Sequence, residues 1–193
     1  MIAANALAEG SLKLIVFKDR AGWSEIILAR PAAYTEARYA TGFRLRTVPC
    51  DSRVDRLHTV KSLNHLPNLL AKRGAVAAGF DEALWLDPRG QVLEGATTNV
   101  FVVKGGVVST PPVESKILPG VMRAEVIRLI GPSSVRERVV LLDELLQADE
   151  VFVTNALLGI MPVAQVDATV YGHCGHTLAR AWMKALAQRF EER

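Results

Sequence analysis

Residues 82–108 constrain the fold most, because they alternate apolar runs with tight-turn sequences. Residues 82–86 and 92–103 have strand character and flank an Asp-Pro-Arg-Gly turn. A second turn, Lys-Gly-Gly at 104–106, leads into the apolar pair at 107–108. Three adjacent strands of an antiparallel sheet are therefore predicted here.

The rest of the chain mixes strand and helix patterns. Further strands are predicted at residues 12–17, 24–28, 42–48, 135–140, 150–154 and 161–166. Helices are predicted at residues 62–78, 121–130, 143–147 and 176–190, with Asp143 capping the third. Charged, aperiodic residues 50–60 predict a linker. The mixture predicts an α+β fold, with helices outside antiparallel sheets.

Composition narrows the classes of function. Lys and Arg total 23 against 20 Asp and Glu, and no basic run occurs, so a nucleic-acid partner is not expected. Cys50 and Cys174 lie far apart and outside any Cys/His cluster, which argues against a metal site or a disulfide framework and fits a reducing, cytoplasmic location. The start lacks a basic region and no long apolar run follows, so neither a signal peptide nor a membrane partner is expected.

Lys61 lies where the predicted linker meets the helix at 62–78. Two interpretations stay open for this residue alone. It is either a solvated structural lysine, as most lysines are, or a desolvated amine of lowered pKa that forms an imine with an aldehyde cofactor. The second interpretation requires companion residues elsewhere in the chain.

Glu94 interrupts the apolar strand pattern of 92–103 and is followed by Gly-Ala-Thr-Thr-Asn. Burying this carboxylate without a partner would be costly. It would be satisfied opposite a pyridinium N–H, where it would keep a cofactor ring protonated. The alternative is a bulge that leaves Glu94 in solvent.

Two further places offer hydrogen-bond donors. Pro119-Gly120 opens a helix whose first N–H groups, from Val121 and Met122, suit a phosphate, although every helix has such an end. Thr154 and Asn155 offer a hydroxyl and an amide at the end of a strand. That segment could also be only a strand-ending turn.

Four motifs, together and in order, closely resemble those of the fold-type IV pyridoxal-phosphate enzymes, the class IV aminotransferase family. They are residues 56–64, 94–101, 117–123, and 154–156 with 162–163. The resemblance runs over nearly the whole chain. It implies the remainder of a small α/β domain at 1–49, a linker at 50–60 and a larger, barrel-like mixed-sheet domain at 61–193.

The resemblance also implies roles for individual residues. Lys61 would form the Schiff base with pyridoxal 5'-phosphate and shuttle the proton, while Glu94 would pair with the ring nitrogen. The remaining cofactor contacts would be Thr98 and Asn99 near the ring, with Val121, Met122, Thr154 and Asn155 around the phosphate. His65 and Ala156 are candidate substrate contacts, although His65 could equally be a solvated helix residue.

The family holds 4-amino-4-deoxychorismate lyases, branched-chain aminotransferases and D-amino-acid aminotransferases. The Lys-Ser-Leu-Asn-x-Leu-Pro-Asn run at 61–68 looks like the lyase and D-amino-acid branches, and residues 154–163 look most like the lyase. We therefore expect conversion of 4-amino-4-deoxychorismate to 4-aminobenzoate and pyruvate. An aminotransferase of branched-chain or D-amino acids is the alternative. A homodimer acting on a small amino-carboxylate is implied in either case.

The first residues resemble a point midway through the family's smaller domain. The earlier part of that domain supplies an arginine to the cofactor phosphate in relatives, and bidentate pairing of that kind strengthens binding. The chain is therefore expected to be a fragment or a short form. A third hypothesis follows, a truncated pyridoxal-phosphate fold with impaired catalysis.

Overall fold

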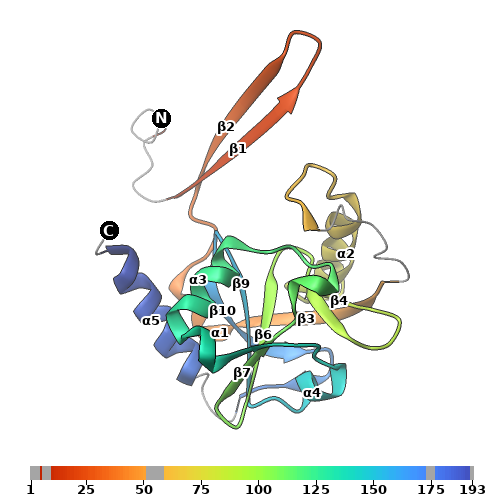
Figure 1. Ribbon diagram of the computed structural model, residues 1–193, viewed down its shortest axis with the longest axis vertical. Coiled ribbons are helices and arrows are strands. Elements are labelled where there is room, and N and C mark those ends of the chain that lie inside the picture. Colours follow the sequence, from red (N-terminus) through yellow and green to blue (C-terminus); the bar gives the residue numbers. More distant parts are fainter. Residues whose placement is uncertain (1–4, 6–9, 51–58, 173–176, 192–193) are drawn as a thin grey trace.

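The computed structural model describes residues 5, 10–50, 59–172 and 177–191 (Figure 1). The strands are β1 (Gly10–Lys18), β2 (Trp23–Pro31), β3 (Phe43–Pro49), β4 (Glu82–Leu86), β5 (Val92–Gly95), β6 (Asn99–Lys104), β7 (Val107–Thr110), β8 (Val135–Glu137), β9 (Glu150–Asn155), β10 (Gly159–Val166) and β11 (Thr169–Val170). The α-helices are α1 (Glu36–Thr41), α2 (Leu66–Ala77), α3 (Val121–Ile130), α4 (Leu142–Leu146) and α5 (Thr177–Glu191). Two 3-10 turns are η3 (Val113–Ser115) and η4 (Pro132–Ser134).

Within the described part of the chain, nine strands form one mixed sheet in the order β5-β4-β3-β10-β9-β6-β7-β8, with β11 beside β10. The β3–β4, β3–β10 and β7–β8 pairs are parallel, and the other pairs are antiparallel. The two ends of the sheet meet, because the N–H of Val92 donates to the carbonyl of Val140 at 2.8 Å and Gln91 bridges Leu141. The predicted barrel-like α+β fold is confirmed.

The central strands β6 and β9 are buried on both faces. Val100 and Val153 face the barrel interior, where Leu145 of α4 joins the same apolar cluster. Phe101 and Phe152 belong to the opposite cluster, stacked with ring centroids 4.8 Å apart under α3 and α5. Covering both faces excludes water from the strand ends that form the candidate site.

Two contacts place the outer helices. The buried carboxylate of Glu150 accepts the N–H groups of Leu178 at 3.1 Å and Ala179 at 3.0 Å, which holds the start of α5 against β9. Ala75 of α2 packs in one small cluster with Ala83 of β4. These small side chains let α2 approach the sheet closely.

The β1–β2 hairpin projects from the barrel (Figure 1). Its two strands pair with each other from Gly10↔Pro31 to Lys18↔Trp23. Apolar side chains on it, including Leu14 and Val16, are more than half exposed. The hairpin thus presents apolar surface to solvent.

The prediction of three adjacent antiparallel strands is wrong. β5 pairs with β4, whereas β6 lies between β9 and β7. The predicted strand 92–103 breaks because Gly95 donates its N–H to the carbonyl of Thr98 at 2.8 Å, a tight turn that redirects the chain. The polar run after Glu94 therefore joins two separate strands of the sheet.

β3, which belongs to the segment 1–49 predicted as the small domain, runs through the large sheet between β10 and β4. Most of the predicted linker lies outside the described residues. The helix expected from residue 62 begins only at Leu66, with Pro67 in its first turn. Asp143 does not cap α4; the Glu144 carboxylate accepts the N–H of Leu141 at 3.0 Å instead.

Candidate active site

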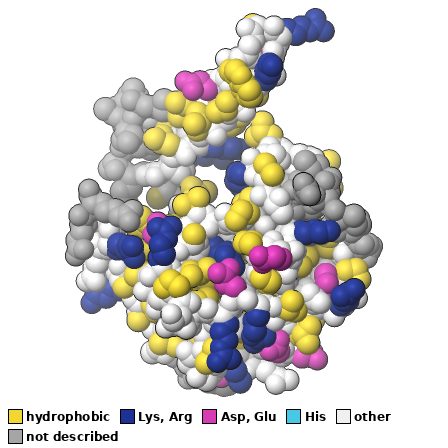
Figure 2. Space-filling view, in the orientation of Figure 1, with side chains coloured by type: hydrophobic (Ala, Val, Ile, Leu, Met, Phe, Trp, Pro, Cys, Tyr) yellow, Lys and Arg dark blue, Asp and Glu magenta, His cyan; other side chains and the backbone are white. Residues whose placement is uncertain are grey.

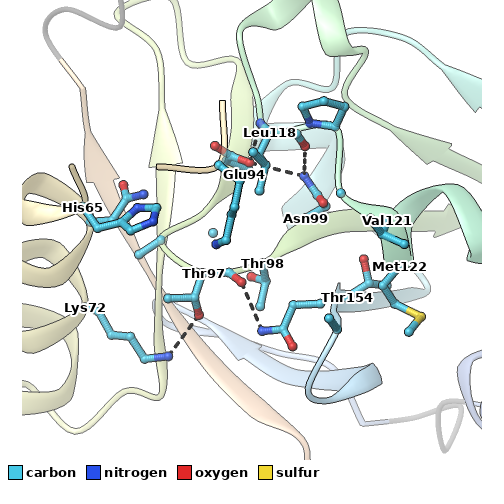
Figure 3. A pocket seen from close by; sticks show the side chains of 18 of the residues that line it. His65, Lys72, Glu94, Thr97, Thr98, Asn99, Leu118, Val121, Met122 and Thr154 are labelled. Atoms are coloured by element: carbon cyan, nitrogen blue, oxygen red, sulfur yellow. Dashed lines mark hydrogen bonds between the residues drawn. The ribbon is translucent and has the colours of Figure 1, made fainter. Parts of the chain in front are cut away.

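A cavity of about 450 Å³ opens where the four motifs converge (Figure 3). Its wall combines the segment before α2 with the turn between β5 and β6, the start of α3 and the turn after β9. Every residue predicted for the site lines it: Lys61, His65, Glu94, Thr98, Asn99, Val121, Met122, Thr154, Asn155 and Ala156. Segments far apart in sequence are thus brought to one place.

Glu94 is buried at the end of β5, with 5% of its surface exposed. Its Oε2 accepts the backbone N–H of Leu118 at 3.0 Å and the side-chain amide of Asn99 at 3.2 Å. These donors stabilise a carboxylate away from water. The exposed-bulge interpretation is wrong, and Glu94 instead lies in the cavity wall.

Asn99 holds Glu94 in place. Besides its bond to Glu94, its Nδ2 donates to the carbonyl of Leu118 at 2.9 Å. A Cβ added at Gly120 would overlap Asn99 Oδ1. Glycine is therefore required at the start of α3, because the backbone there touches the amide that orients the carboxylate.

Replacing Gly120 with alanine is expected to destabilise the protein by about 1–3 kcal/mol, since the added methyl group forces Asn99 from its position. Thermal unfolding measures the effect. Gly74→Ala is the control, because a Cβ at this helical position meets nothing within 4 Å. It should stabilise α2 by about 0.5–1 kcal/mol. Equal stability of Gly120→Ala and wild type would contradict this account of the contact.

The opposite end of the cavity suits an anion. Thr98 and Thr154 are 5% and 0% exposed, and their hydroxyl oxygens have no hydrogen-bond partner within the described part of the chain. Beside them α3 begins at Val121, and no side chain caps its Gly120 N-terminus. Figure 3 places these two threonines and the start of α3 on one side of the cavity. A phosphate would accept hydrogen bonds from both hydroxyls and from the free N–H groups of the helix start.

Asn155 lies in the wall but uses its side chain locally. Its Oδ1 accepts the N–H groups of Leu157 at 2.8 Å and Leu158 at 3.0 Å, and its Nδ2 donates to the carbonyl of Thr97 at 3.1 Å. The amide therefore shapes the turn after β9 and ties it to the neighbouring turn. The strand-ending-turn interpretation describes its observed contacts.

Lys61 and His65 lie on the side of the cavity nearest α2. Lys61 is exposed in the segment before the helix, and His65 is half-buried at its N-terminus. Burial lowers the pKa of His65, and the positive charges of Lys61 and Lys13 lower it further. The lowered pKa favours the neutral form of His65, which limits the positive charge beside Lys61.

Other residues of this wall, among them Asn68, Lys72 and Thr97, were not predicted. Lys72 Nζ donates to Thr97 Oγ1 at 3.1 Å and lies 3.4 Å from Oε2 of Glu82, which is fully buried. The spacing of His65, Asn68 and Lys72 puts all three on one face of α2, and all three line the cavity. This polar stripe was visible in the sequence.

The family profile for "Amino-transferase class IV" matches residues 1–166. The chain belongs to the class IV aminotransferase family. A candidate branched-chain-amino-acid aminotransferase of Methanocaldococcus jannaschii is 45% identical over 113 residues, 58% of this chain and 39% of that protein. A D-alanine aminotransferase of Bacillus licheniformis is 39% identical over 115 residues, 58% of this chain and 40% of that protein. The matched region spans about two fifths of these relatives' length.

Solved structures of class IV aminotransferase relatives share the fold. A candidate 4-amino-4-deoxychorismate lyase of Legionella pneumophila is 27% identical with a TM-score of 0.83, over 97% of this chain and 72% of that one. A branched-chain amino acid aminotransferase of Escherichia coli is 30% identical with a TM-score of 0.82, over 97% and 67% of the two chains. Another branched-chain enzyme, 32% identical with a TM-score of 0.71, was solved with pyridoxamine 5'-phosphate. The family's cofactor is pyridoxal 5'-phosphate, and the unpartnered hydroxyls beside α3 fit its phosphate.

Replacing Thr154 with valine tests that fit. Removing a buried hydroxyl that lacks a partner should leave the cofactor-free protein as stable as wild type or about 1 kcal/mol more stable. Affinity for pyridoxal 5'-phosphate should fall about five- to tenfold, because one donor is lost. Thermal unfolding without cofactor and an absorbance titration measure the two effects.

Thr110→Val is the matched control, because the buried Thr110 hydroxyl does have a partner, the carbonyl of Val100 at 2.8 Å. This variant should lose stability. A destabilised Thr154→Val protein with wild-type cofactor affinity would contradict the assignment of Thr154 to the phosphate.

Proposed function

We propose that this cavity binds pyridoxal 5'-phosphate and that the chain acts on the amino-bearing carbon of a small amino-carboxylate. One observation carries the proposal. A single cavity combines a buried, hydrogen-bonded carboxylate at Glu94 with two unpartnered buried hydroxyls beside an uncapped helix start, and Lys61 lies on its wall. A carboxylate and an anion site suit the two ends of one cofactor.

Each group has a distinct task in this proposal. The hydroxyls of Thr98 and Thr154 and the first N–H groups of α3 bind the phosphate. Glu94, oriented by Asn99, accepts the ring N–H. When bound, the cofactor withdraws electrons from the substrate carbon that bears the amino group. Lys61 Nζ would hold the cofactor covalently until the substrate's amino group displaces it, and the freed amine would then take the proton from that carbon.

The lyase is the first candidate for the overall reaction. In it Lys61 would remove the proton from the substrate carbon that bears the amino group. The bond between the substrate ring and the enolpyruvyl oxygen would then break. Protonation of the released enolpyruvate would give pyruvate, and the substrate ring would become aromatic 4-aminobenzoate. The pattern at 154–163 supports this choice, as does the structural likeness to the candidate lyase of Legionella pneumophila.

Amino transfer is the second candidate. The curated relatives with 45% and 39% identity are named as branched-chain and D-alanine aminotransferases. In this reaction Lys61 would relay the proton between substrate and cofactor, and the cofactor would carry the amino group until a 2-oxo acid accepts it. The same cavity residues serve both reactions. The two reactions differ in where the proton goes and in whether a 2-oxo acid is needed to accept the amino group.

The deciding experiment incubates the cofactor-treated chain with 4-amino-4-deoxychorismate and, separately, with a panel of L- and D-amino acids plus 2-oxoglutarate. We expect 4-aminobenzoate and pyruvate without any 2-oxo acid. Product formation only with 2-oxoglutarate would support the aminotransferase instead. Cofactor uptake with no turnover in either assay would support the impaired-catalysis hypothesis.

We also propose that the chain acts in the cytoplasm as a homodimer, as the family resemblance implies. Exposed apolar side chains on β1 and β2 supply surface for self-association. Within the described residues no helix is long and apolar enough to cross a membrane. Light scattering of the purified chain measures the assembly, and a monomer at micromolar concentration would contradict the dimer.

A further inference from the structure

An ion pair with a buried carboxylate lies beside the cavity wall that carries Glu94. Glu82 of β4 is 0% exposed, and its Oε1 accepts the N–H of Ala83 at 3.0 Å. Lys72 of α2 holds its Nζ 3.4 Å from Glu82 Oε2, with 29% of the lysine side chain exposed. Burying a carboxylate this completely is costly unless partners surround it. The chemistry proposed above does not use this pair.

Thr97 connects the ion pair to the cavity (Figure 3). Its hydroxyl accepts a hydrogen bond from Lys72 Nζ at 3.1 Å and donates one to Glu82. Its carbonyl accepts the Asn155 side chain at 3.1 Å. The Thr97 hydroxyl donates its proton to Glu82 and accepts one from Lys72, so these two bonds fix the orientation of the Thr97 side chain. The turn at Thr97 is therefore fastened to α2, to β4 and to the turn after β9.

The same turn sets the position of both ends of the proposed cofactor site. It joins Glu94, at the end of β5, to Thr98, whose hydroxyl is one of the unpartnered pair. A Cβ added at Gly95 would overlap Thr98 Oγ1 and approach Glu82 Cγ to 3.3 Å. Glu82 thus packs under the turn, and a shift of Thr97 would move the carboxylate and the hydroxyl together.

We propose that Lys72 is a positioning residue for the cofactor site, acting through Thr97 on the turn that carries Glu94 and Thr98. The inference rests on the proposed function, because it assigns this turn to cofactor binding. The charge of Lys72 is already paired with Glu82, so the lysine suits an anchoring role better than capture of a substrate carboxylate. The hydrogen bonds of Lys72 go to Thr97 and Glu82, and neither residue is assigned to the chemistry.

The experiment measures the dissociation constant for pyridoxal 5'-phosphate by absorbance titration of the full chain. Lys72→Met keeps the side-chain stem but removes the ammonium, and we expect about tenfold weaker binding. Lys72→Arg retains a cation that reaches Thr97, so it should recover part of the loss. Arg73→Met, at the exposed next position of α2, is the control and should bind as wild type.

A double-mutant cycle separates positioning from general destabilisation. If Lys72 acts through the turn that carries Glu94, the fold loss of cofactor affinity caused by Lys72→Met should be several-fold smaller in a Glu94→Gln background than in wild type. Fully additive losses would overturn the proposal, because they would mean that the two residues act independently. Wild-type affinity in Lys72→Met would overturn it as well.

Thr97→Val provides a second test if Lys72→Met does not fold. This variant removes the hydroxyl link and leaves the Lys72–Glu82 pair in place, so weaker cofactor binding with the same non-additivity is expected. The failures are distinguishable. A wild-type chain that takes up no cofactor would refute the proposed function, whereas wild-type uptake that is unchanged in Thr97→Val would refute only the role of Lys72.

Discussion

Lys61→Ala is expected to abolish turnover, with kcat reduced by at least about a thousandfold. The lysine amine is proposed both to hold the cofactor covalently and to move the substrate proton, and no other lysine of the described chain except Lys72 lines the cavity. Lys72 is engaged with Glu82 and Thr97 and so does not substitute. The measurements are kcat in the assay that proves productive and the visible absorbance of the cofactor-treated protein.

Lys184→Ala is the matched control for this prediction. Lys184 is exposed on α5, away from the cavity lining, so its removal should change neither kcat nor absorbance. If Lys61→Ala kept the wild-type absorbance and turnover, the lysine would be a solvated structural residue. That was the alternative interpretation of its sequence context.

Glu94→Gln should lower kcat by about a hundredfold while the cofactor stays attached to Lys61. Glutamine keeps the size of the side chain and an oxygen for the Leu118 N–H, so the buried wall should retain its shape. The negative charge is lost, and with it the stabilisation of a protonated ring nitrogen. The fall should therefore appear in kcat, measured at saturating substrate and cofactor.

Glu114→Gln serves as the control, because Glu114 is an acidic residue outside the cavity lining and should have no effect. Unchanged kcat in Glu94→Gln would mean that the carboxylate has only a structural role at this position. Loss of the covalent cofactor in Glu94→Gln would likewise contradict the division of tasks between Glu94 and Lys61.

Local sequence patterns predicted most of the elements. The helix at 121–130 begins and ends as expected, because Pro119-Gly120 and Gly131-Pro132 mark both ends. β9 and β10 follow from apolar runs separated by a turn. The predicted site residues come from short motifs that are contiguous in sequence, and all of them line one cavity; their roles stay predictions.

Features that depend on distant contacts were not predicted. Nothing local shows that β6 pairs with β9 instead of β5, because that pairing depends on residues about fifty positions away. The burial of Glu82 is equally non-local, since it requires Lys72 of α2 and Thr97 of the turn to meet it. An unpartnered hydroxyl such as that of Thr154 is recognisable only once its neighbours are in place.

The four motifs are proposed to form one pyridoxal 5'-phosphate site anchored at Lys61, and Figure 2 shows that other lysines and arginines are spread over the visible face of the molecule. The most direct test reduces the cofactor-treated chain with borohydride, which makes the attachment permanent, and locates the adduct by peptide mass mapping. We predict a single phosphopyridoxyl group on the peptide that contains Lys61. No adduct, or an adduct spread over surface lysines in place of Lys61, would contradict the claim.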